Sequence, residues 1–143
     1  MDTHKIIGKV EFSLPSSIFR NRNLSFLESI VVYLKELQRL RYADIARLTN
    51  RDRRNIFSLY ERACKKLKDK PFIVDEKPPV FYIPISVVQD RSLSIMEIVV
   101  EYLLSLGLRN SEIAKLLARS PKTIYTVHAR VNAKRDMKKK NRK

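Results

Sequence analysis

Ile45-Ala-Arg-Leu-Thr-Asn-Arg-Asp-Arg-Arg-Asn-Ile56 occurs a second time in the chain, with changes, as Ile113-Ala-Lys-Leu-Leu-Ala-Arg-Ser-Pro-Lys-Thr-Ile124. Both windows pass from an apolar helical pattern through a short polar break into a second helical pattern. The similarity extends outward from these windows over residues 12–68 and 81–135. Self-similarity at a fixed period indicates one supersecondary unit used twice. We therefore expect two copies of one small helical unit.

The alignment of the two copies changes its offset once. The offset is 69 residues from Phe12/Phe81 through Leu34/Leu103 and 68 residues from Leu40/Leu108 onward. The second copy therefore lacks one residue between its first two predicted helices. Identity is kept at Pro15/Pro84, Arg22/Arg91, Leu24/Leu93, Ser25/Ser94, Glu28/Glu97, Tyr33/Tyr102, Leu34/Leu103, Ile45/Ile113, Ala46/Ala114, Leu48/Leu116, Arg51/Arg119, Ile56/Ile124 and Arg62/Arg130.

The first predicted helix of each copy begins with a capping box, Ser25 with Glu28 and Ser94 with Glu97. In a capping box the serine oxygen and the glutamate side chain each accept a backbone N–H that the helix leaves unpaired. Gly107 is expected to end the helix in the second copy. Apolar residues recur at helical spacing at Leu27, Ile30, Val31, Leu34 and Leu37, and at Met96, Val99, Val100, Leu103 and Leu104.

The second predicted helices span residues 42–48 and 110–117, and the third begin at Asp52 and at Ser120-Pro121. Asp and Ser are favoured N-caps, and Pro is favoured at the first helical position. Helical spacing predicts a buried face formed by Ile56, Leu59, Tyr60, Ala63 and Leu67 in the first copy, and by Ile124, Val127, His128 and Val131 in the second. It turns outward Arg54, Ser58, Glu61 and Lys65, and likewise Lys122, Thr126, Ala129 and Ala133.

These patterns predict an all-α fold of two tandem three-helix units. A short extended or β segment precedes each first helix, and these segments either pair as strands or serve as arms that cover a helix. The predicted divisions are residues 1–68, a Pro-rich and extended linker at 69–80, residues 81–135, and a basic tail at 136–143. Units of this size are near the lower limit for an independent core, so the copies either fold separately or pack on each other.

The charge of the chain favours a polyanionic partner. Among its 143 residues, 30 Lys and Arg stand against 15 Asp and Glu, which gives a net charge of +15. Neutralising phosphates with such a surface releases counterions and drives binding to nucleic acid. Residues 134–143 hold seven basic residues and one acidic residue, and we expect the last six, residues 138–143, to be disordered on their own and to bind phosphates nonspecifically when DNA is near.

Several classes of protein are disfavoured by composition. One cysteine, Cys64, allows no internal disulfide, and His4 and His128 cannot complete a metal site with it. The acidic residues are scattered, so we expect neither an enzyme nor a cofactor. No apolar run approaches the roughly 20 residues that a membrane span requires, and no secretion signal is visible. We expect a cytoplasmic, nucleoid-associated protein.

Three segments of the first copy, at residues 42–48, 51–56 and 61–67, resemble region four of bacterial sigma factors and the related output domains of response regulators. The second copy is similar over residues 110–117 and 120–126. The resemblance covers about 30 residues of each copy. It implies a helix-turn-helix whose third helix lies in the DNA major groove. The chain departs from the family in having no other sigma region, no receiver domain and a Pro-containing segment before each first helix.

Charge and resemblance together predict a sequence-specific double-stranded DNA-binding protein, a transcriptional regulator that reads a composite site. Arg and Lys near the start of a recognition helix can donate to guanine, Asn can pair with adenine, and Ser, Thr and aromatic residues can contact base edges. The candidate base contacts are Arg53, Arg54, Asn55 and Ser58 in the first copy, and Lys122, Thr123, Tyr125 and Thr126 in the second. Phe57 is expected to pack between the copies.

A second group of cations is expected to bind phosphates and to position the protein without reading sequence. Arg51 and Arg119 occupy the same place in the two turns, where the alternative is a salt bridge to Asp44 or Glu112. The full set of candidate phosphate contacts is Arg22, Arg51, Arg62, Lys65, Arg91, Arg119, Arg130 and Lys134.

Other functions remain open at this point. An architectural protein that binds DNA without sequence preference, or an RNA-associated protein, has the same charge. RNA polymerase is a second candidate partner, and residues 80–88 or the exposed face of the first helix are then the expected docking sites. Tandem copies without dimer symmetry fit a direct-repeat or composite operator, although the sequence leaves their relative orientation open.

Overall fold

The computed structural model describes residues 12–75 and 77–141 and is mostly helical, with a small two-stranded sheet. The all-α prediction is confirmed at this level. The first copy contains β1 (Ser13–Pro15), the 3-10 helix η1 (Ser16–Arg20), α2 (Phe26–Val32), the π-helix η2 (Tyr33–Leu37), α3 (Tyr42–Thr49) and α4 (Arg53–Leu67). The second contains β2 (Tyr82–Pro84), the 3-10 helix η3 (Ile85–Gln89), α5 (Ile95–Ser105), α6 (Asn110–Leu117) and α7 (Pro121–Asn141).

The predicted starts and stops of the helices are confirmed. Both serine capping boxes form at α2 and α5. Asp52 caps α4, and the Ser120 hydroxyl accepts a hydrogen bond from the Thr123 N–H in the first turn of α7. Gly107 follows the C-cap of α5 with φ of +94°, in the left-handed region that glycine adopts without a steric penalty.

The extra residue of the first copy is accommodated as a π-helical turn. The Gln38 N–H donates to the Tyr33 carbonyl five residues earlier, at 3.2 Å. This wider turn lies where the alignment offset changes from 69 to 68, and α5 continues there as an ordinary α-helix. An inserted residue in a helix is commonly absorbed in this way. The copies therefore stay equivalent on both sides of the insertion.

The segments that precede the first helices pair with each other, which decides between strands and separate arms. β1 and β2 are antiparallel, with Leu14 opposite Ile83. These two residues are equivalents in the repeat, so an approximate two-fold axis passes between them. The flanking hydrogen bonds obey the same symmetry, because Ser16 N–H donates to the Phe81 carbonyl and Ile85 N–H to the Phe12 carbonyl, both at 2.8 Å. The relative orientation of the copies, which the sequence leaves open, is therefore an approximate two-fold rotation.

After the strands, the 3-10 helix of each copy packs against the other copy. η1 packs against α6 and η3 packs against α3. Arg20 Nη1 donates to the carbonyls of Lys115 and Leu116 at 3.0 and 3.1 Å. Its equivalent Gln89 donates from Nε2 to the Leu48 carbonyl at 3.0 Å. The second alternative therefore also holds in part, because the 3-10 helix that follows each strand covers a helix of the other copy.

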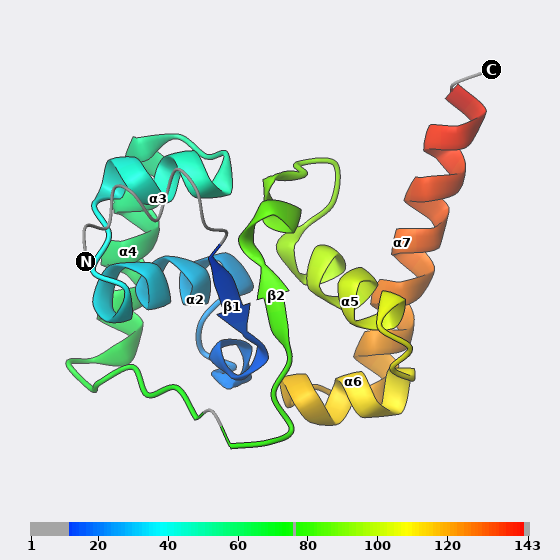
Figure 1. Ribbon diagram of the computed structural model, residues 1–143, viewed down its shortest axis with the longest axis horizontal. Coiled ribbons are helices and arrows are strands. Elements are labelled where there is room, and N and C mark those ends of the chain that lie inside the picture. Colours follow the sequence, from blue (N-terminus) through cyan, green and yellow to red (C-terminus); the bar gives the residue numbers. More distant parts are fainter. Residues whose placement is uncertain (1–11, 76, 142–143) are drawn as a thin grey trace.

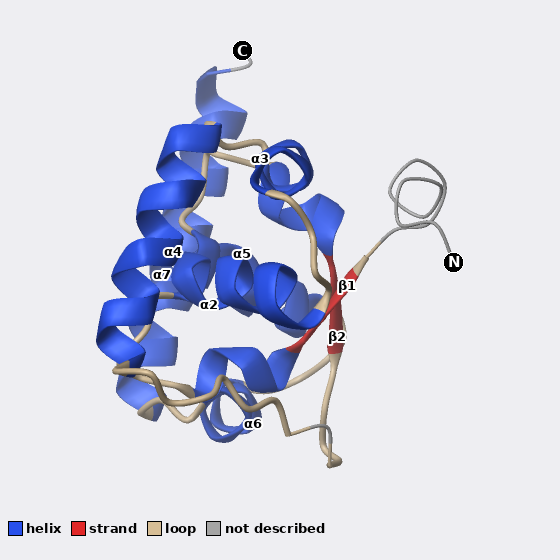
Figure 2. Cartoon of the chain, turned by 90° about the vertical axis from the view of Figure 1, so that its left-hand side faces the viewer, coloured by secondary structure: helices blue, strands red, loops and turns tan. Residues whose placement is uncertain are grey.

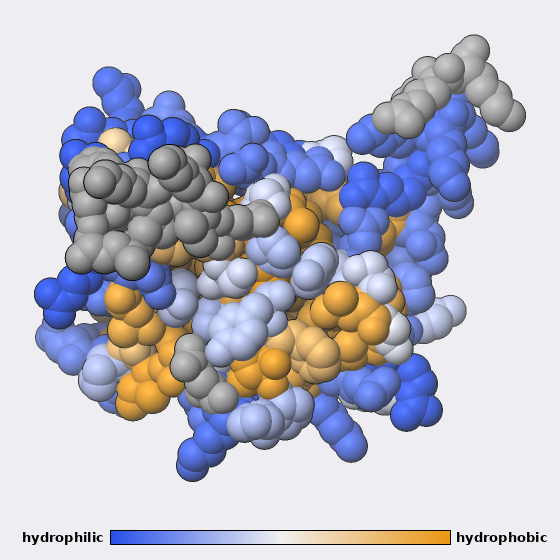
Figure 3. Space-filling view, in the orientation of Figure 1, coloured by the Kyte–Doolittle hydropathy of each residue, from blue (hydrophilic) through white to orange (hydrophobic). Residues whose placement is uncertain are grey.

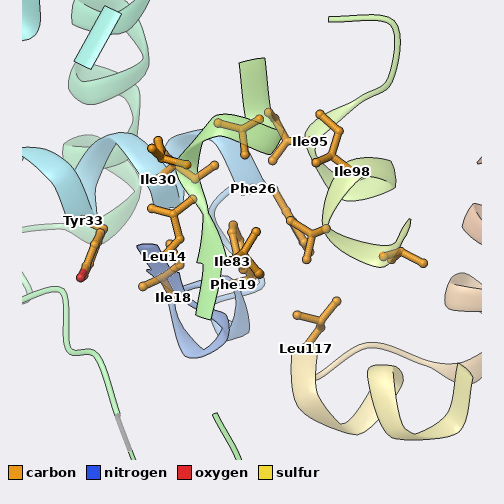
Figure 4. Close-up of a cluster of buried hydrophobic side chains, with 14 of the residues drawn as sticks. Leu14, Ile18, Phe19, Phe26, Ile30, Tyr33, Ile83, Ile95, Ile98 and Leu117 are labelled. Carbon is orange, nitrogen blue, oxygen red and sulfur yellow. The ribbon is translucent and has the colours of Figure 1, made fainter. Parts of the chain in front are cut away.

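This exchange gives the two copies a common hydrophobic core. Figure 4 shows Phe19 and Leu14 of the first copy among Ile83, Ile98 and Leu117 of the second. The predicted boundary at residues 69–80 separates the repeats along the chain, but one buried cluster contains residues of both. The segment 80–88 contributes Ile83, Ile85 and Val88 to it, so the expected docking segment is largely covered.

The helices lie in layers behind the strands. In Figure 1 α3 lies at the upper left and α6 at the lower right, with α2 and α5 on either side of the strands. Figure 2 places β1 and β2 at one edge and α4 with α7 at the opposite edge, with α2 and α5 between them. The face that carries the strands has apolar side chains over its middle and hydrophilic ones around its rim and along α7 (Figure 3). The third helices of both copies therefore share the face opposite the strands.

The prediction of a disordered tail is wrong for residues 138–141, because α7 continues through Asn141. Residues 133–140 contain no glycine, proline or β-branched residue, and Ala, Met, Lys and Arg are strong helix formers. Arg135 also holds the helix to α5 through two hydrogen bonds to Glu101, at 2.8 and 2.6 Å. The terminal lysines complement the negative end of the helix dipole. Residues 142 and 143 lie outside the described part.

Candidate nucleic-acid interface

The turns that lead into α4 and α7 have the same backbone in both copies. Asn50 and Ala118 follow α3 and α6 with left-handed φ values of 55° and 54°. Two further residues then lead to the first residue of the next helix, Arg53 or Pro121. Because the turns match, α4 and α7 leave α3 and α6 in the same way, and equivalent residues of the two helices take equivalent positions.

The predicted faces of α4 and α7 are confirmed. Ile56, Leu59 and Ala63 are buried on α4, as are Ile124, Val127 and Val131 on α7. Every candidate base contact is exposed, namely Arg53, Arg54, Asn55, Ser58, Lys122, Thr123, Tyr125 and Thr126. These side chains therefore occupy solvent-facing positions on the outer layer of helices.

The two hydroxyl groups of the second copy have local partners. Thr126 Oγ1 donates to the Lys122 carbonyl at 3.0 Å, and Thr123 Oγ1 lies 2.9 Å from Ser120 Oγ. The hydrogen bond made by Thr126 fixes the direction of its side chain and leaves the oxygen able to accept. These residues are thus held in place before any ligand binds.

The flanking aromatic residues differ between the copies. Tyr125 is 68% exposed, whereas Phe57 is 46% exposed and packs edge-on against Tyr42, with ring centroids 5.4 Å apart. Tyr42 belongs to the same copy, so the expectation that Phe57 packs between the copies is wrong. Tyr125 presents the larger free aromatic surface on this face.

Arg51 and Arg119 form neither of the expected salt bridges. Nη1 of Arg51 donates to the Thr49 carbonyl at 2.8 Å, and Nη1 of Arg119 donates to the Leu117 carbonyl at 2.9 Å. Asp44 pairs instead with Arg41 and Arg47, and Glu112 pairs with Arg109. Each half-buried guanidinium therefore closes the C-terminal end of its preceding helix and brings its charge to the turn.

Arg51 and Arg119 are each affected by the charge of one candidate phosphate contact from the other copy. Burial lowers the pKa of Arg51, and the charge of Arg91 lowers it further. Burial likewise lowers the pKa of Arg119, with a second contribution from Arg22. Arg119 also lies over the Phe26 ring of the other copy, 5.2 Å from its centroid. The same long-range repulsion therefore acts at equivalent positions of the two copies.

The remaining candidates divide into exposed and paired groups. Arg62, Lys65 and Arg130 are exposed on α4 and α7. Lys134 is committed to an ion pair, because its Nζ lies 2.7 Å from Glu97 Oε1. Lys66 makes the equivalent pair with Glu28 at 2.7 Å. Lys134 therefore ties α7 to the capping box of α5, and its role as a phosphate contact stays a prediction.

Glu28 and Glu97 make stability depend on pH. Burial alone would raise the pKa of both carboxyls, but hydrogen bonds from Lys66 or Lys134 and from the serine N–H groups outweigh it, and each pKa is lowered from 4.5. These groups are more acidic in the folded chain than in the unfolded chain. Their contribution to stability is therefore complete above the unfolded pKa and is lost as pH falls through the folded value.

We expect the free energy of unfolding to decrease steadily as the pH is lowered from about 5, where both carboxylates are charged. Urea unfolding at a series of pH values measures this slope. In the Glu28→Gln/Glu97→Gln variant the slope should be smaller, although Asp44 and Asp90, whose pKa values are also lowered, leave part of it. An unchanged slope in this variant would contradict the assignment of the two pairs.

Sequence reasoning missed the contacts that bind the copies together. Arg20 and Gln89 were not singled out, although the repeat alignment places a long donor side chain at the same position in both copies. Arg135, which contacts Glu101 and Asp90, has no counterpart in the first copy, where Leu67, Val32 and Asn21 stand instead. A residue that differs between copies gave no repeat signal.

Residues 12–75 and 77–141 contain neither a metal-binding cluster nor a membrane-spanning helix. No group of three or more metal-ligating side chains is found there. Nor does any helix in that part of the chain have the length and apolar character to cross a membrane. Comparison with protein-family models, with curated proteins and with solved structures finds no match to this chain, so the assignment rests on its own residues.

Proposed function

We propose that this chain is a sequence-specific double-stranded DNA-binding protein that regulates transcription, with two helix-turn-helix units in one polypeptide. The observation that carries the proposal is the placement of α4 and α7 on one face, opposite the strands, with all eight candidate base contacts exposed (Figure 2). A duplex laid against that face would meet both helices.

The helix pairs support the assignment of each unit. α3 packs on α4 and α6 packs on α7, each pair joined by a three-residue turn whose first residue is left-handed. In helix-turn-helix proteins the second helix of such a pair enters the major groove and its N-terminal residues contact base edges. The corresponding residues are Arg54 and Asn55 on α4 and Lys122 and Thr123 on α7.

The surrounding cations are expected to bind DNA phosphates, and this part of the binding does not depend on the base sequence. Arg51 and Arg119 lie in the turns that precede the two helices, and the charges of Arg91 and Arg22 contribute to lowering their pKa values. Phosphate contacts at such positions fix the register of a protein on the duplex. The net charge of +15 adds long-range attraction to DNA.

A competition experiment tests the proposal. After a preferred site has been selected from random duplexes, we expect that site to bind at least about 10³-fold more tightly than random DNA. The slope of log K against log salt should be about −5 to −7 if 6–8 phosphates are neutralised. The same slope without discrimination would contradict the proposal and favour an architectural protein. Preference for RNA over duplex DNA would likewise contradict it.

A further inference from the structure

We infer that the two recognition helices read half-sites in inverted orientation, so that the DNA target is an imperfect palindrome. This inference rests on the proposed function and deepens it, because it names the class of duplex that the interface fits. It replaces the direct-repeat arrangement that two tandem copies would suggest.

The first step is the symmetry of the pair of strands, β1 and β2. Leu14 pairs with its repeat equivalent Ile83 in an antiparallel register, and the neighbouring pairs Ser13 with Pro84 and Pro15 with Tyr82 exchange under the same rotation. Two copies related by a translation along the chain could not form such a self-complementary contact. A contact in which the same surface faces itself requires a two-fold axis.

The second step extends this axis to the recognition helices. η1 on α6 and η3 on α3 are equivalent contacts, so the rotation includes the helices that precede α4 and α7. In Figure 1 α4 descends from α3 at the upper left, while α7 rises from α6 at the lower right. Figure 2 places both on the same outer face. Their N-terminal ends are therefore presented to a duplex in opposite directions.

The third step is the symmetry of DNA. A two-fold symmetric pair of helix-turn-helix units binds half-sites whose inversion mirrors the symmetry of the protein. Here the symmetry is approximate, because the exposed residues Arg54, Asn55 and Ser58 are replaced in the second copy by Lys122, Thr123 and Thr126. The two half-sites should therefore be inverted but unequal in sequence.

The inference can be tested directly by making α4 and α7 alike at four exposed positions. The variant Lys122→Arg/Thr123→Asn/Tyr125→Phe/Thr126→Ser gives α7 the exposed residues of α4. A matched control, Arg54→Lys/Asn55→Thr/Phe57→Tyr/Ser58→Thr, gives α4 those of α7. All eight positions are exposed, so both variants should melt like the unaltered chain in circular dichroism. Arg53 and Pro121 stay unchanged in both, because proline is favoured at the first helical position.

Each variant and the unaltered chain are used to select from random duplexes that can hold two half-sites about one helical turn, roughly 10 base pairs, apart. We expect each variant to enrich its own palindrome, and the unaltered chain to enrich a site with one half from each. Each variant should also bind its palindrome about tenfold or more tightly than the same half-sites arranged as a direct repeat.

The possible failures are distinguishable. Enrichment of a direct repeat, or of a single half-site, overturns the inverted arrangement while leaving sequence-specific binding in place. Absence of any enriched sequence with the unaltered chain overturns the proposed function itself, and the inference with it. Footprinting of the selected site gives an independent readout, because protection should be centred on a dyad.

Discussion

Replacing Phe19 with alanine is expected to lower the free energy of unfolding by about 3–5 kcal/mol, among the largest effects of any single substitution in this chain. Phe19 is fully buried and stacks on Phe26, with ring centroids 4.6 Å apart. It lies on η1, which crosses to α6 of the other copy. The cavity left by its ring would therefore open where the two copies meet, and thermal unfolding should shift down by about 10 °C or more.

The shift should be shared by both copies, because they have one core. Hydrogen exchange measured at the amides of α4 and α7 should show similar losses of protection in the Phe19→Ala protein. Tyr125→Ala, which removes an exposed ring, serves as the control and should change the free energy of unfolding by no more than about 0.5 kcal/mol. A melt with two steps, in which the second copy keeps its original midpoint, would show that the copies fold independently.

Features encoded within a few residues were predicted from the sequence. The boxes at Ser25 and Ser94, the stop at Gly107 and the buried faces of α4 and α7 depend on contacts three or four residues apart. The capping boxes and the buried faces recur in both copies, so the pattern in one copy supports the same assignment in the other. The exposure of Arg54 and Lys122 followed from the same periodicity.

Features that depend on contacts between the copies were left open by the sequence or were missed. The pairing of Leu14 with Ile83 joins residues 69 positions apart, and nothing local to either strand specifies its partner. The same is true of Arg20, whose acceptors lie on α6. The extension of α7 was missed because a dense run of lysines resembles a disordered tail. Its anchor, the contact of Arg135 with Glu101, is tertiary.

Because of the two-fold axis, the candidate site contains arginines from both copies. These residues are far apart in the sequence. Arg22 and Arg119 are 97 residues apart, and Arg51 and Arg91 are 40 apart, yet in each pair the charge of one residue lowers the pKa of the other. The proposed phosphate-binding region contains residues of both copies. It therefore depends on the packing of η1 against α6 and of η3 against α3. DNA binding and the stability of the core are therefore expected to be coupled.

The Arg54→Ala/Lys122→Ala protein should lose most of its preference for the selected site. Each side chain is expected to contribute about 1–3 kcal/mol through a base contact, and the two act on separate helices without a shared partner, so their effects should add to about 2–6 kcal/mol. Competition binding with the selected site and with random DNA measures the loss. Binding to random DNA should change much less, since phosphate contacts made by other residues remain.

Arg51→Ala is the matched comparison, because Arg51 lies on the turn three residues before Arg54 and its guanidinium already closes α3. This variant should weaken binding to all sequences alike and make the salt slope shallower by about 1. Arg54→Ala alone should instead relax the preference at one base position and leave the others. If Arg51→Ala and Arg54→Ala give the same profile over a set of single-base variants, the division between base contacts and phosphate contacts on this face is wrong, because only a base contact makes the loss depend on which base pair is changed.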